Sequence, residues 1–416
     1  MTELLHVVLI GFAILALLGV VFEEVIHVNK AKVTLFLGTV SWLIMFIFSP
    51  DEAHLLTVEE GLSESISEIA QLWLFLVAAM TFVAYLNKKG LIQNLIYLFL
   101  PSRISEPMLL FLTGIFCFVF SSIADNITAT LVSSALILSL NLETKKTLRF
   151  AALVVFAVNS GGVALITGDV TTLMIFLSGH VGVLQLLYLS LPALCGVLVL
   201  TLILSFGLKG EVVINKQMTP IRKVDLFIGA VFLCTILLTI AFNALFHIPP
   251  MLTFLAGMSL MFLIARFFND DDDDPILDYV RVIEFETLLF FLGILLLVGM
   301  LKEIGVLHSI VSLYDMMPPV LANYLMGILS AGIDNVPLTA AVLKSGIHMD
   351  TPEWMGLTYA VGVGGSLLII GSAAGIVMMS KLSELTFGRY VRFILPLLVA
   401  YSVGYAGTYF MGHLLF

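Results

Sequence analysis

The chain has 416 residues, of which 60% are hydrophobic and only 12% are charged. This composition excludes a soluble globular protein and a nucleic-acid-binding protein, and it is typical of a polytopic membrane protein. Part of the net charge of −10 comes from one acidic run, Asp270 to Asp274, which we interpret as a solvated loop. Cys117, Cys195 and Cys234 lie in apolar segments, where packing is favoured over a disulfide or a metal site.

Ten apolar segments are predicted to cross the bilayer, because a spanning helix needs about 17–25 predominantly apolar residues. The first, which starts near the N-terminus, carries Glu3 instead of basic residues and has no cleavage site after it, so we expect an uncleaved span. The ten predicted spans are 4–22, 33–48, 69–86, 149–180, 183–207, 224–246, 249–267, 287–301, 353–380 and 391–413.

Two further apolar segments, 107–141 and 318–344, are long enough for two half-helices each, and we interpret both as re-entrant hairpins. With this topology, all of the 19 Lys and Arg residues except Lys302 and Lys344 fall on one face of the membrane. The positive-inside rule makes that face cytoplasmic and places both termini outside. A full crossing at 107–141 would separate Arg103 from the basic residues at 145–149 and spoil this asymmetry.

The two halves of the chain resemble each other. Leu86 to Leu91 matches Leu301 to Val306, the pair Asp125-Asn126 matches Asp334-Asn335, and both halves have three spans, a hairpin and two spans. Because five crossings is an odd number, the second copy must be inverted relative to the first. The predicted fold is therefore an all-α membrane protein with two inverted repeats, 1–208 and 224–416, joined by a cytoplasmic linker at 209–223; this pattern is typical of secondary transporters.

Polar residues interrupt the apolar segments at four places, which we expect to converge near the middle of the membrane. A charged side chain there costs at least roughly 2.5–3.5 kcal/mol, so membrane carboxylates usually serve an ion, a proton or a substrate. Oxygen ligands suit hard cations such as Na⁺, and no Lys or Arg lies in any break. The candidate ion- and proton-binding residues are Asp125, Asn126, Thr128, Asn159, Ser160, Asp169, Thr171, Thr172, Ser330, Asp334, Asn335, Ser366 and Ser372.

These motifs resemble those of the NhaD-type sodium/proton antiporters, which belong to an ion transporter superfamily with arsenite and dicarboxylate carriers. The resemblance is carried by Asp125 to Thr128, Asn159 to Gly162, Gly168 to Thr172 and Ser330 to Pro337. It implies a scaffold part and a moving transport part, often in a homodimer, in the inner membrane of a bacterial cell. It implies exchange of Na⁺ or Li⁺ for H⁺ without a cofactor. We expect Na⁺ to bind through Asp125, Asn159, Asp169 and Asp334, and we expect no nucleic-acid or soluble protein partner.

Simpler interpretations of the same residues remain open. Asp125 and Asp334 would also serve as N-caps of the second half-helix in each hairpin, and Asp169 would also serve as a structural hydrogen-bond partner. Two other functions compete with cation exchange. One is transport of an anion, arsenite or a carboxylate, on the same fold; the other is intramembrane aspartyl proteolysis, in which two membrane aspartates form a dyad.

Overall fold

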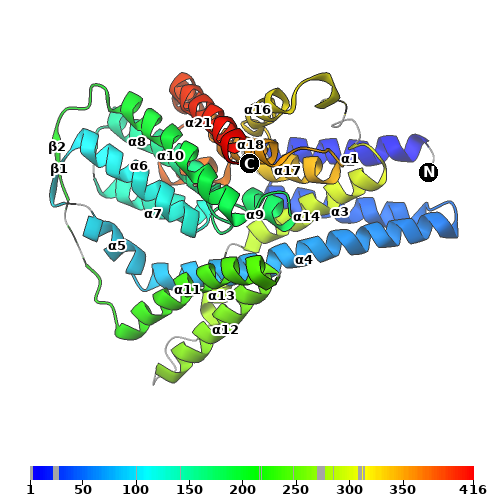
Figure 1. Cartoon of the computed structure of the whole chain (residues 1–416), viewed down its shortest axis with the longest axis horizontal. Coiled ribbons are helices and arrows are strands. Elements are labelled where there is room, and N and C mark those ends of the chain that lie inside the picture. Colours follow the sequence, from blue (N-terminus) through cyan, green and yellow to red (C-terminus); the bar gives the residue numbers. More distant parts are fainter. Residues whose placement is uncertain are drawn as a thin grey trace.

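The computed structural model describes residues 3–21, 28–99, 101–140, 142–214, 216, 218–246, 248–268, 277–283, 285–307, 312 and 314–416. The fold is almost entirely helical (Figure 1). Eight helices in the described part of the chain are long and apolar enough to cross a membrane. The protein is therefore a multi-pass membrane protein.

The elements of the first half are α1 (Glu3–Val21), α3 (Lys30–Ile47), α4 (Glu52–Lys88), α5 (Leu91–Phe99), β1 (Arg103–Ser105), α6 (Glu106–Ile123), α7 (Asn126–Ser139), α8 (Thr144–Gly162), α9 (Val170–Leu177), α10 (Val183–Ser205) and β2 (Glu211–Val213). The elements of the second half are α11 (Lys223–Phe246), α12 (Pro250–Phe268), α13 (Leu277–Val282), α14 (Phe285–Glu303), α16 (Pro319–Ser330), α17 (Asn335–Lys344), α18 (Thr351–Gly364), α19 (Ala373–Lys381), α20 (Phe387–Tyr390), the 3₁₀ turn η1 (Val391–Phe393) and α21 (Ile394–Leu415). The predicted acidic loop, Asp270 to Asp274, lies outside the described residues.

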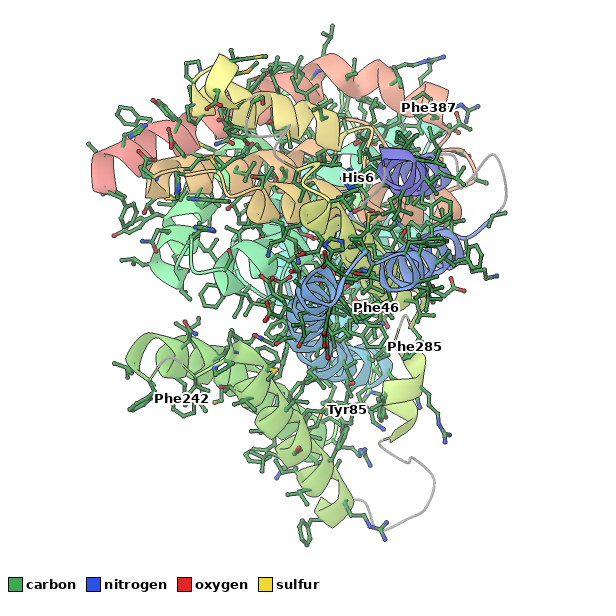
Figure 2. The ribbon with its side chains drawn as sticks, turned by 90° about the vertical axis from the view of Figure 1, so that its right-hand side faces the viewer. His6, Phe46, Tyr85, Phe242, Phe285 and Phe387 are labelled. Carbon is green, nitrogen blue, oxygen red and sulfur yellow. The ribbon has the colours of Figure 1, made fainter. Side chains whose placement is uncertain are left out.

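Helix α4 is much longer than the predicted span 69–86. It starts at Glu52, where the Asp51 carboxylate accepts a hydrogen bond from the His54 amide at 2.7 Å and caps the helix. The additional turns hold several glutamates and serines, so this stretch is too polar to be predicted as a membrane span, although glutamate favours helix formation. Figure 1 shows α4 as a long rod along the lower side of the main body, and α12 projects below it; Figure 2 also shows α11 and α12 projecting from the body.

The predicted hairpins form two helix pairs. The first helix pair is α6 and α7, and the second helix pair is α16 and α17. Helix α6, with 18 residues, reaches spanning length, so the first arm of the first pair is longer than the half-helix that we expected. The two helices α6 and α7 are separated by extended backbone at Ala124 and Asp125, where Asp125 starts the second helix.

Two long predicted spans are broken as expected. Helices α8 and α9 flank a turn at 163–169, and α18 and α19 flank a turn at 365–372. Glycine allows close helix crossings beside both breaks, because a Cβ at Gly161 would lie 2.1 Å from the Phe118 carbonyl oxygen and one at Gly364 would lie 2.0 Å from the Gly327 carbonyl oxygen. The glycine pairs therefore serve the packing of each broken span on its neighbouring helix pair.

The packing of the first half is matched in the second half. Helix α8 packs on α6 and α10, and α18 packs on α16 and α21; likewise α3 packs on α14, while α12 packs on α4. The turns after α4 and α14 also match, since Gly90 and Gly305 both have φ near +74°. Each of these contacts therefore has a counterpart between the corresponding segments of the other predicted repeat.

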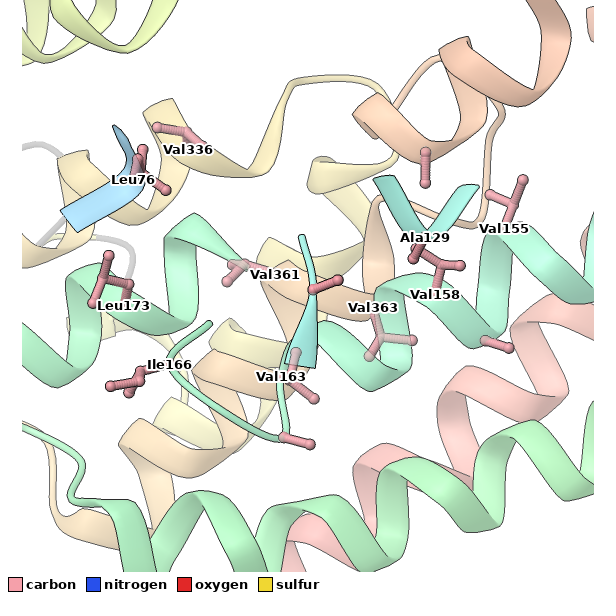
Figure 3. Packing of buried hydrophobic residues seen from close by; sticks show 14 of the residues in the cluster. Leu76, Ala129, Val155, Val158, Val163, Ile166, Leu173, Val336, Val361 and Val363 are labelled. Atoms are coloured by element: carbon pink, nitrogen blue, oxygen red, sulfur yellow. The ribbon is translucent and has the colours of Figure 1, made fainter. Parts of the chain in front are cut away.

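The apolar core surrounds the two breaks. Val155 and Val158 on α8 and Val361 and Val363 on α18 are completely buried, and Figure 3 shows them among the side chains of the buried apolar cluster. Helices α3 and α14 form a second close contact, in which the Trp42 indole N–H donates to the Leu296 carbonyl at 2.9 Å. These contacts hold the polar breaks between two groups of packed helices.

A short antiparallel sheet was not predicted. Strand β1 pairs with β2, with Ile104 opposite Val212, and both of these side chains are buried. The sheet connects the segment that enters α6 with the segment that leaves α10.

Candidate functional site

Asp169 lies where the two helix pairs meet. It precedes α9 but makes no side-chain cap to that helix, so its carboxylate is free to turn toward its neighbours. Asn126 of the first helix pair donates to Oδ1 at 3.2 Å, and Asn335 of the second helix pair donates to Oδ2 at 3.2 Å. The Thr171 hydroxyl also donates to Oδ2. One carboxylate therefore joins both predicted hairpin tips.

The Asn126 side chain is held by neighbours from both sides. The Ser121 hydroxyl donates to Asn126 Oδ1 at 2.8 Å, which leaves the amide nitrogen directed toward Asp169. A Cβ at Gly162 would lie 2.7 Å from Asn126 Oδ1, so a residue without a side chain is needed at the end of α8. This close approach explains why glycine ends the helix there.

Asp125 and Asp334 both cap helices, as one of the simpler interpretations proposed. Asp125 Oδ1 accepts from the Thr128 amide at 2.9 Å, and Oδ2 accepts from the Thr128 hydroxyl at 2.7 Å. Asp334 Oδ1 accepts from the Val336 amide at 3.2 Å. The cap therefore engages both oxygens of Asp125 but only one oxygen of Asp334.

The second oxygen of Asp334 forms an ion pair that the sequence did not reveal. Lys30, the first residue of α3, places its Nζ 3.1 Å from Asp334 Oδ2 and 4.5 Å from the centre of the Phe290 ring. Our sequence analysis counted Lys30 among the cytoplasmic basic residues and found no cation in the polar breaks. The lysine comes from outside the breaks, at the end of a span, and its stem carries the ammonium into the site.

Two more polar residues that the sequence analysis did not select lie beside Lys30. Asn29 caps α3 by accepting from the Ala31 amide at 2.8 Å, and its amide donates to Glu286 Oε2, at the start of α14, at 2.6 Å. The sequence signal for these residues is a polar side chain directly before an apolar helix. That signal is present at most helix starts, so it does not identify a site. The contacts between α3 and α14 could not be read from such a local pattern.

Asn159 and Ser372 link the two broken spans. The Asn159 amide donates to the Val155 carbonyl at 2.7 Å and to the Ser372 hydroxyl at 3.1 Å, while its buried Oδ1 has no hydrogen-bond partner among the described residues. The buried hydroxyls of Ser160 and Thr172 likewise find no partner in the described part of the chain. Buried polar atoms are nearly always satisfied, so these oxygens are candidate ligands of a cation.

The other predicted site residues take structural positions. Ser330 donates to the Val361 carbonyl at 2.8 Å, which joins α16 to α18, and Ser366 donates to the Val363 carbonyl of its own turn at 2.6 Å. Thr128 reaches the site through its hydrogen bonds to Asp125. Ser330, Ser366 and Thr128 do not line the cavity of the site.

A cavity of about 220 Å³ lies at Asp169 and the two asparagines that bind it; Ser160, Thr171 and Thr172 also lie outside its lining. Its polar lining includes Asp125, Asn126, Asn159, Asp169, Asp334, Asn335 and Ser372 from the predicted set, together with Asn29, Lys30, Glu286 and Thr287. Glu286 is exposed, so the cavity reaches the surface at the starts of α3 and α14. The lining is rich in carboxylate, amide and hydroxyl oxygens, which favours a small hard cation.

The carboxylates do not form a closed metal centre. Within the described ranges, no group of three His, Cys, Asp or Glu side chains is placed to hold a metal ion. A cation in this conformation would therefore combine one or two carboxylates with the neutral oxygens around them. Such a loose, mixed site suits an ion that must be released after each cycle.

A second cavity, of about 420 Å³, lies at the far end of α14. Two ion pairs border it: Lys344 on α17 lies 2.8 Å from Glu68 on α4, and Lys302 on α14 lies 2.7 Å from Glu64 on α4. Lys302 and Lys344 are the two basic residues that the predicted topology places outside. The two cavities are therefore separated along the length of α14.

Comparisons with known proteins agree with this arrangement. A family profile described as a citrate transporter (CitMHS) matches residues 7–362. The Na⁺/H⁺ antiporter NhaD of Vibrio cholerae serotype O1 is 30% identical over 95% of this chain and 90% of its own length. NhaD of Alkalimonas amylolytica is 29% identical over 90% of this chain and 84% of its own length. Sodium/proton antiporter 1 of Arabidopsis thaliana is 28% identical over 92% of this chain and 67% of its own length.

These relatives are named as transporters and not as enzymes, so an intramembrane protease is not supported. The match with the Vibrio cholerae protein extends over nearly the whole chain, and the family profile includes the first broken span and both helix pairs. The chain belongs to the citrate transporter family, and its sequence relatives identify it as a member of the NhaD group of Na⁺/H⁺ antiporters.

Proposed function

We infer that this protein is a secondary antiporter that exchanges Na⁺ or Li⁺ for H⁺ across a membrane. The observation that carries the inference is the Asp169 carboxylate, which receives hydrogen bonds from Asn126 and Asn335 of the two helix pairs. A buried carboxylate binds either a cation or a proton, and competition between the two couples their movements. The relatives named Na⁺/H⁺ antiporters support the same ions.

We propose that the ions are carried by alternating access in a fold of ten spans and two re-entrant hairpins, arranged as inverted repeats 1–208 and 224–416. The matched packing of α8 on α6 and of α18 on α16 supports the repeat, as does the shared φ of Gly90 and Gly305. In this arrangement both helix pairs and both broken spans form the moving part. Helices α3, α4, α12 and α14 belong to the scaffold.

The proposed orientation places the starts of α3 and α14 on the cytoplasmic side and both termini outside, in the inner membrane of a bacterial cell. The distribution of Lys and Arg along the chain supports it. The cavity at Asp169 then opens to the cytoplasm, and the cavity at Lys344 lies on the external side. The proposal includes a homodimer, as in transporters that the sequence resembles.

Na⁺ is expected to bind between Asp169 and Asp334 with the oxygens of Asn159 and Asp125 nearby. The unpartnered Asn159 Oδ1 supports this placement, because Asn159 lines the same cavity as the two aspartates and a cation would satisfy its oxygen. Asp125, Asn126 and Asn335 position the carboxylates at the tips. Ser160 and Thr172, whose buried hydroxyls have no partner among the described residues, are further candidate ligands. The turns around the site are supported by Thr128, Thr171, Ser330, Ser366 and Ser372.

The test is proton movement in proteoliposomes under an imposed pH gradient, with Na⁺, Li⁺, K⁺ or citrate added in turn. Wild-type protein should respond to Na⁺ or Li⁺, and Asp169→Asn should lose the response while remaining folded in detergent. Asp315→Asn is the matched control, since Asp315 is exposed and does not line the cavity. A response to citrate alone would identify the anion carrier instead, and exchange retained by Asp169→Asn would contradict the proposed site.

A further inference from the structure

We propose that Lys30 is a tethered cation that occupies Asp334 when the site holds no Na⁺ and must leave it when Na⁺ binds. The proposal rests on the antiport function inferred above and assigns a role within it to a residue outside the polar breaks. Lys30 would thereby set the affinity for Na⁺ and balance the charge of Asp334 in the site without Na⁺.

The geometry places the ammonium where a transported cation would bind. Lys30 Nζ is 3.1 Å from Asp334 Oδ2, and the two side chains are only 17% and 11% exposed. Asp334 Oδ1 already accepts from the Val336 amide, so Oδ2 is the oxygen available to a cation. Na⁺ and the ammonium are therefore directed to the same atom.

The ammonium is held in this position by the scaffold. Asn29 fixes the start of α3 to the start of α14 through its 2.6 Å hydrogen bond to Glu286, and the Phe290 ring on α14 lies 4.5 Å from Nζ. A cation over an aromatic face is stabilised by the ring quadrupole. Lys30 thus belongs to α3 and is held against α14, both in the proposed scaffold, while its partner Asp334 belongs to the second helix pair in the proposed moving part.

The charges around the ammonium explain why a built-in cation is needed. Asp334 on α17, Glu286 on α14, Asp125 before α7 and Asp169 before α9 all line the same cavity as Lys30. Without a cation, these carboxylates would repel one another in a partly desolvated space. When Na⁺ binds at Asp334, its repulsion with the ammonium favours withdrawal of Lys30 toward the open end of the cavity near Glu286.

The first test is transport by Lys30→Gln. Loss of the competing charge should lower the KM for Na⁺ by about tenfold, which corresponds to about 1.4 kcal/mol of removed repulsion. The kcat of Na⁺/H⁺ exchange should fall, because the site that returns with a proton on Asp169 and without Na⁺ has lost the charge that balances Asp334. Isotopic Na⁺/Na⁺ exchange should persist, since that cycle never returns a site without Na⁺.

Two further variants separate charge from structure. Lys30→Arg keeps the positive charge and should keep most of the Na⁺/H⁺ exchange. Lys32→Gln, on an exposed position of the same helix turn, should behave like wild type. A Lys30→Gln variant that raises the KM, or that behaves like Lys32→Gln while wild type exchanges Na⁺, would overturn the proposal. Absence of Na⁺ exchange in wild type would contradict the antiport function itself.

A second measurement uses the wild-type protein, so it does not depend on the folding of any variant. Amine-modifying reagents should label Lys30 faster in the presence of Na⁺ than in the presence of choline, because Na⁺ displaces it from Asp334. Mass spectrometry would compare its labelling with that of Lys32, whose rate should not depend on Na⁺. A Lys30 rate that is unchanged or decreased by Na⁺ would overturn the proposal.

Discussion

Asn126 and Asn335 lie on different helix pairs, 209 positions apart in the chain, yet their amides donate to opposite oxygens of one carboxylate. Asp169 is therefore the point at which the two halves of the site depend on each other. A change in the position of Asn126 or Asn335 therefore affects the same carboxylate, that of Asp169.

The first prediction concerns this coupling. Asn126→Ala and Asn335→Ala should each lower kcat/KM for Na⁺/H⁺ exchange, by on the order of tenfold, since the loss of a hydrogen bond to a charged group costs about 1.5–3 kcal/mol. The double variant should lose less than the sum of the two free-energy changes, because both residues act on one carboxylate. The measurement is a double-mutant cycle: kcat/KM is determined for the wild type, the two single variants and the double variant. Strictly additive losses of free energy would count against a shared partner.

The second prediction concerns the ion pair between Lys344 and Glu68, which joins α17 to α4. In the proposed division of the fold, this pair connects the moving part to the scaffold and must break in the opposite conformation. Lys344→Gln should therefore shift the equilibrium toward the conformation that opens the second cavity, by about fivefold for about 1 kcal/mol. Labelling of a cysteine introduced at the exposed Ser178, which lines that cavity, would report the shift.

The neighbouring pair Lys302–Glu64 provides the matched control, because α14 and α4 both belong to the proposed scaffold. Lys302→Gln should leave the labelling rate unchanged. Equal effects of the two substitutions would show that the second cavity responds only to its local charge and not to movement of α17.

The third prediction concerns the unpartnered hydroxyl of Thr172. Valine has nearly the same shape, so Thr172→Val removes the oxygen and leaves the packing in place. If the oxygen is a ligand, the KM for Na⁺ should rise about tenfold, for about 1.4 kcal/mol of lost binding free energy. Thr39→Val is the control, since the exposed Thr39 hydroxyl bonds only to carbonyls of its own helix.

The alternative outcome for Thr172→Val is equally informative. A buried hydroxyl without a partner destabilises the fold, so its removal would raise the melting temperature in the absence of Na⁺. A stabilised variant with an unchanged KM would remove Thr172 from the set of ligands.

The fourth prediction concerns the crossings of the broken spans. Gly161→Ala would force a methyl group against the Phe118 carbonyl, and Gly364→Ala would force one against the Gly327 carbonyl. Each should destabilise the protein by about 1–3 kcal/mol or more, because backbone cannot move aside as a flexible side chain can. Thermal unfolding in detergent would measure the loss, with Gly11→Ala as the control, since no atom lies within 4 Å of its added Cβ. Unchanged melting of Gly161→Ala would show that α6 and α8 separate easily.

The membrane class, the family and the positions of the four polar breaks could be predicted from the sequence, because polar residues inside apolar segments are a local signal. The length of α4 could not be predicted in the same way, since residues before 69 are helical without being apolar. The small sheet escaped notice for a similar reason: three-residue strands in connecting loops have no periodicity to detect.

The site residues could be found as a set, but their different roles could not be assigned. Asp125 and Asp169 both precede helices. Both oxygens of Asp125 accept hydrogen bonds from Thr128 in its own helix cap, whereas Asp169 accepts hydrogen bonds from the two asparagines. Lys30 was missed because its partner Asp334 lies 304 positions away and because basic residues at span ends usually face water. Roles of this kind depend on tertiary contacts that no local motif encodes.

The sheet formed by β1 and β2 has a mechanical consequence. Because β1 leads directly into α6 and β2 follows α10, the first helix pair cannot be displaced without drawing α10 along with it. The pull would then pass to the chain after Val213, which two hydrogen bonds between Asn94 and Thr219 fasten to α5. The six peptide steps from Val213 to Thr219 extend to at most about 21 Å. If the first helix pair moves in the proposed cycle, the length of this connection limits how far it can travel before α5 is drawn along.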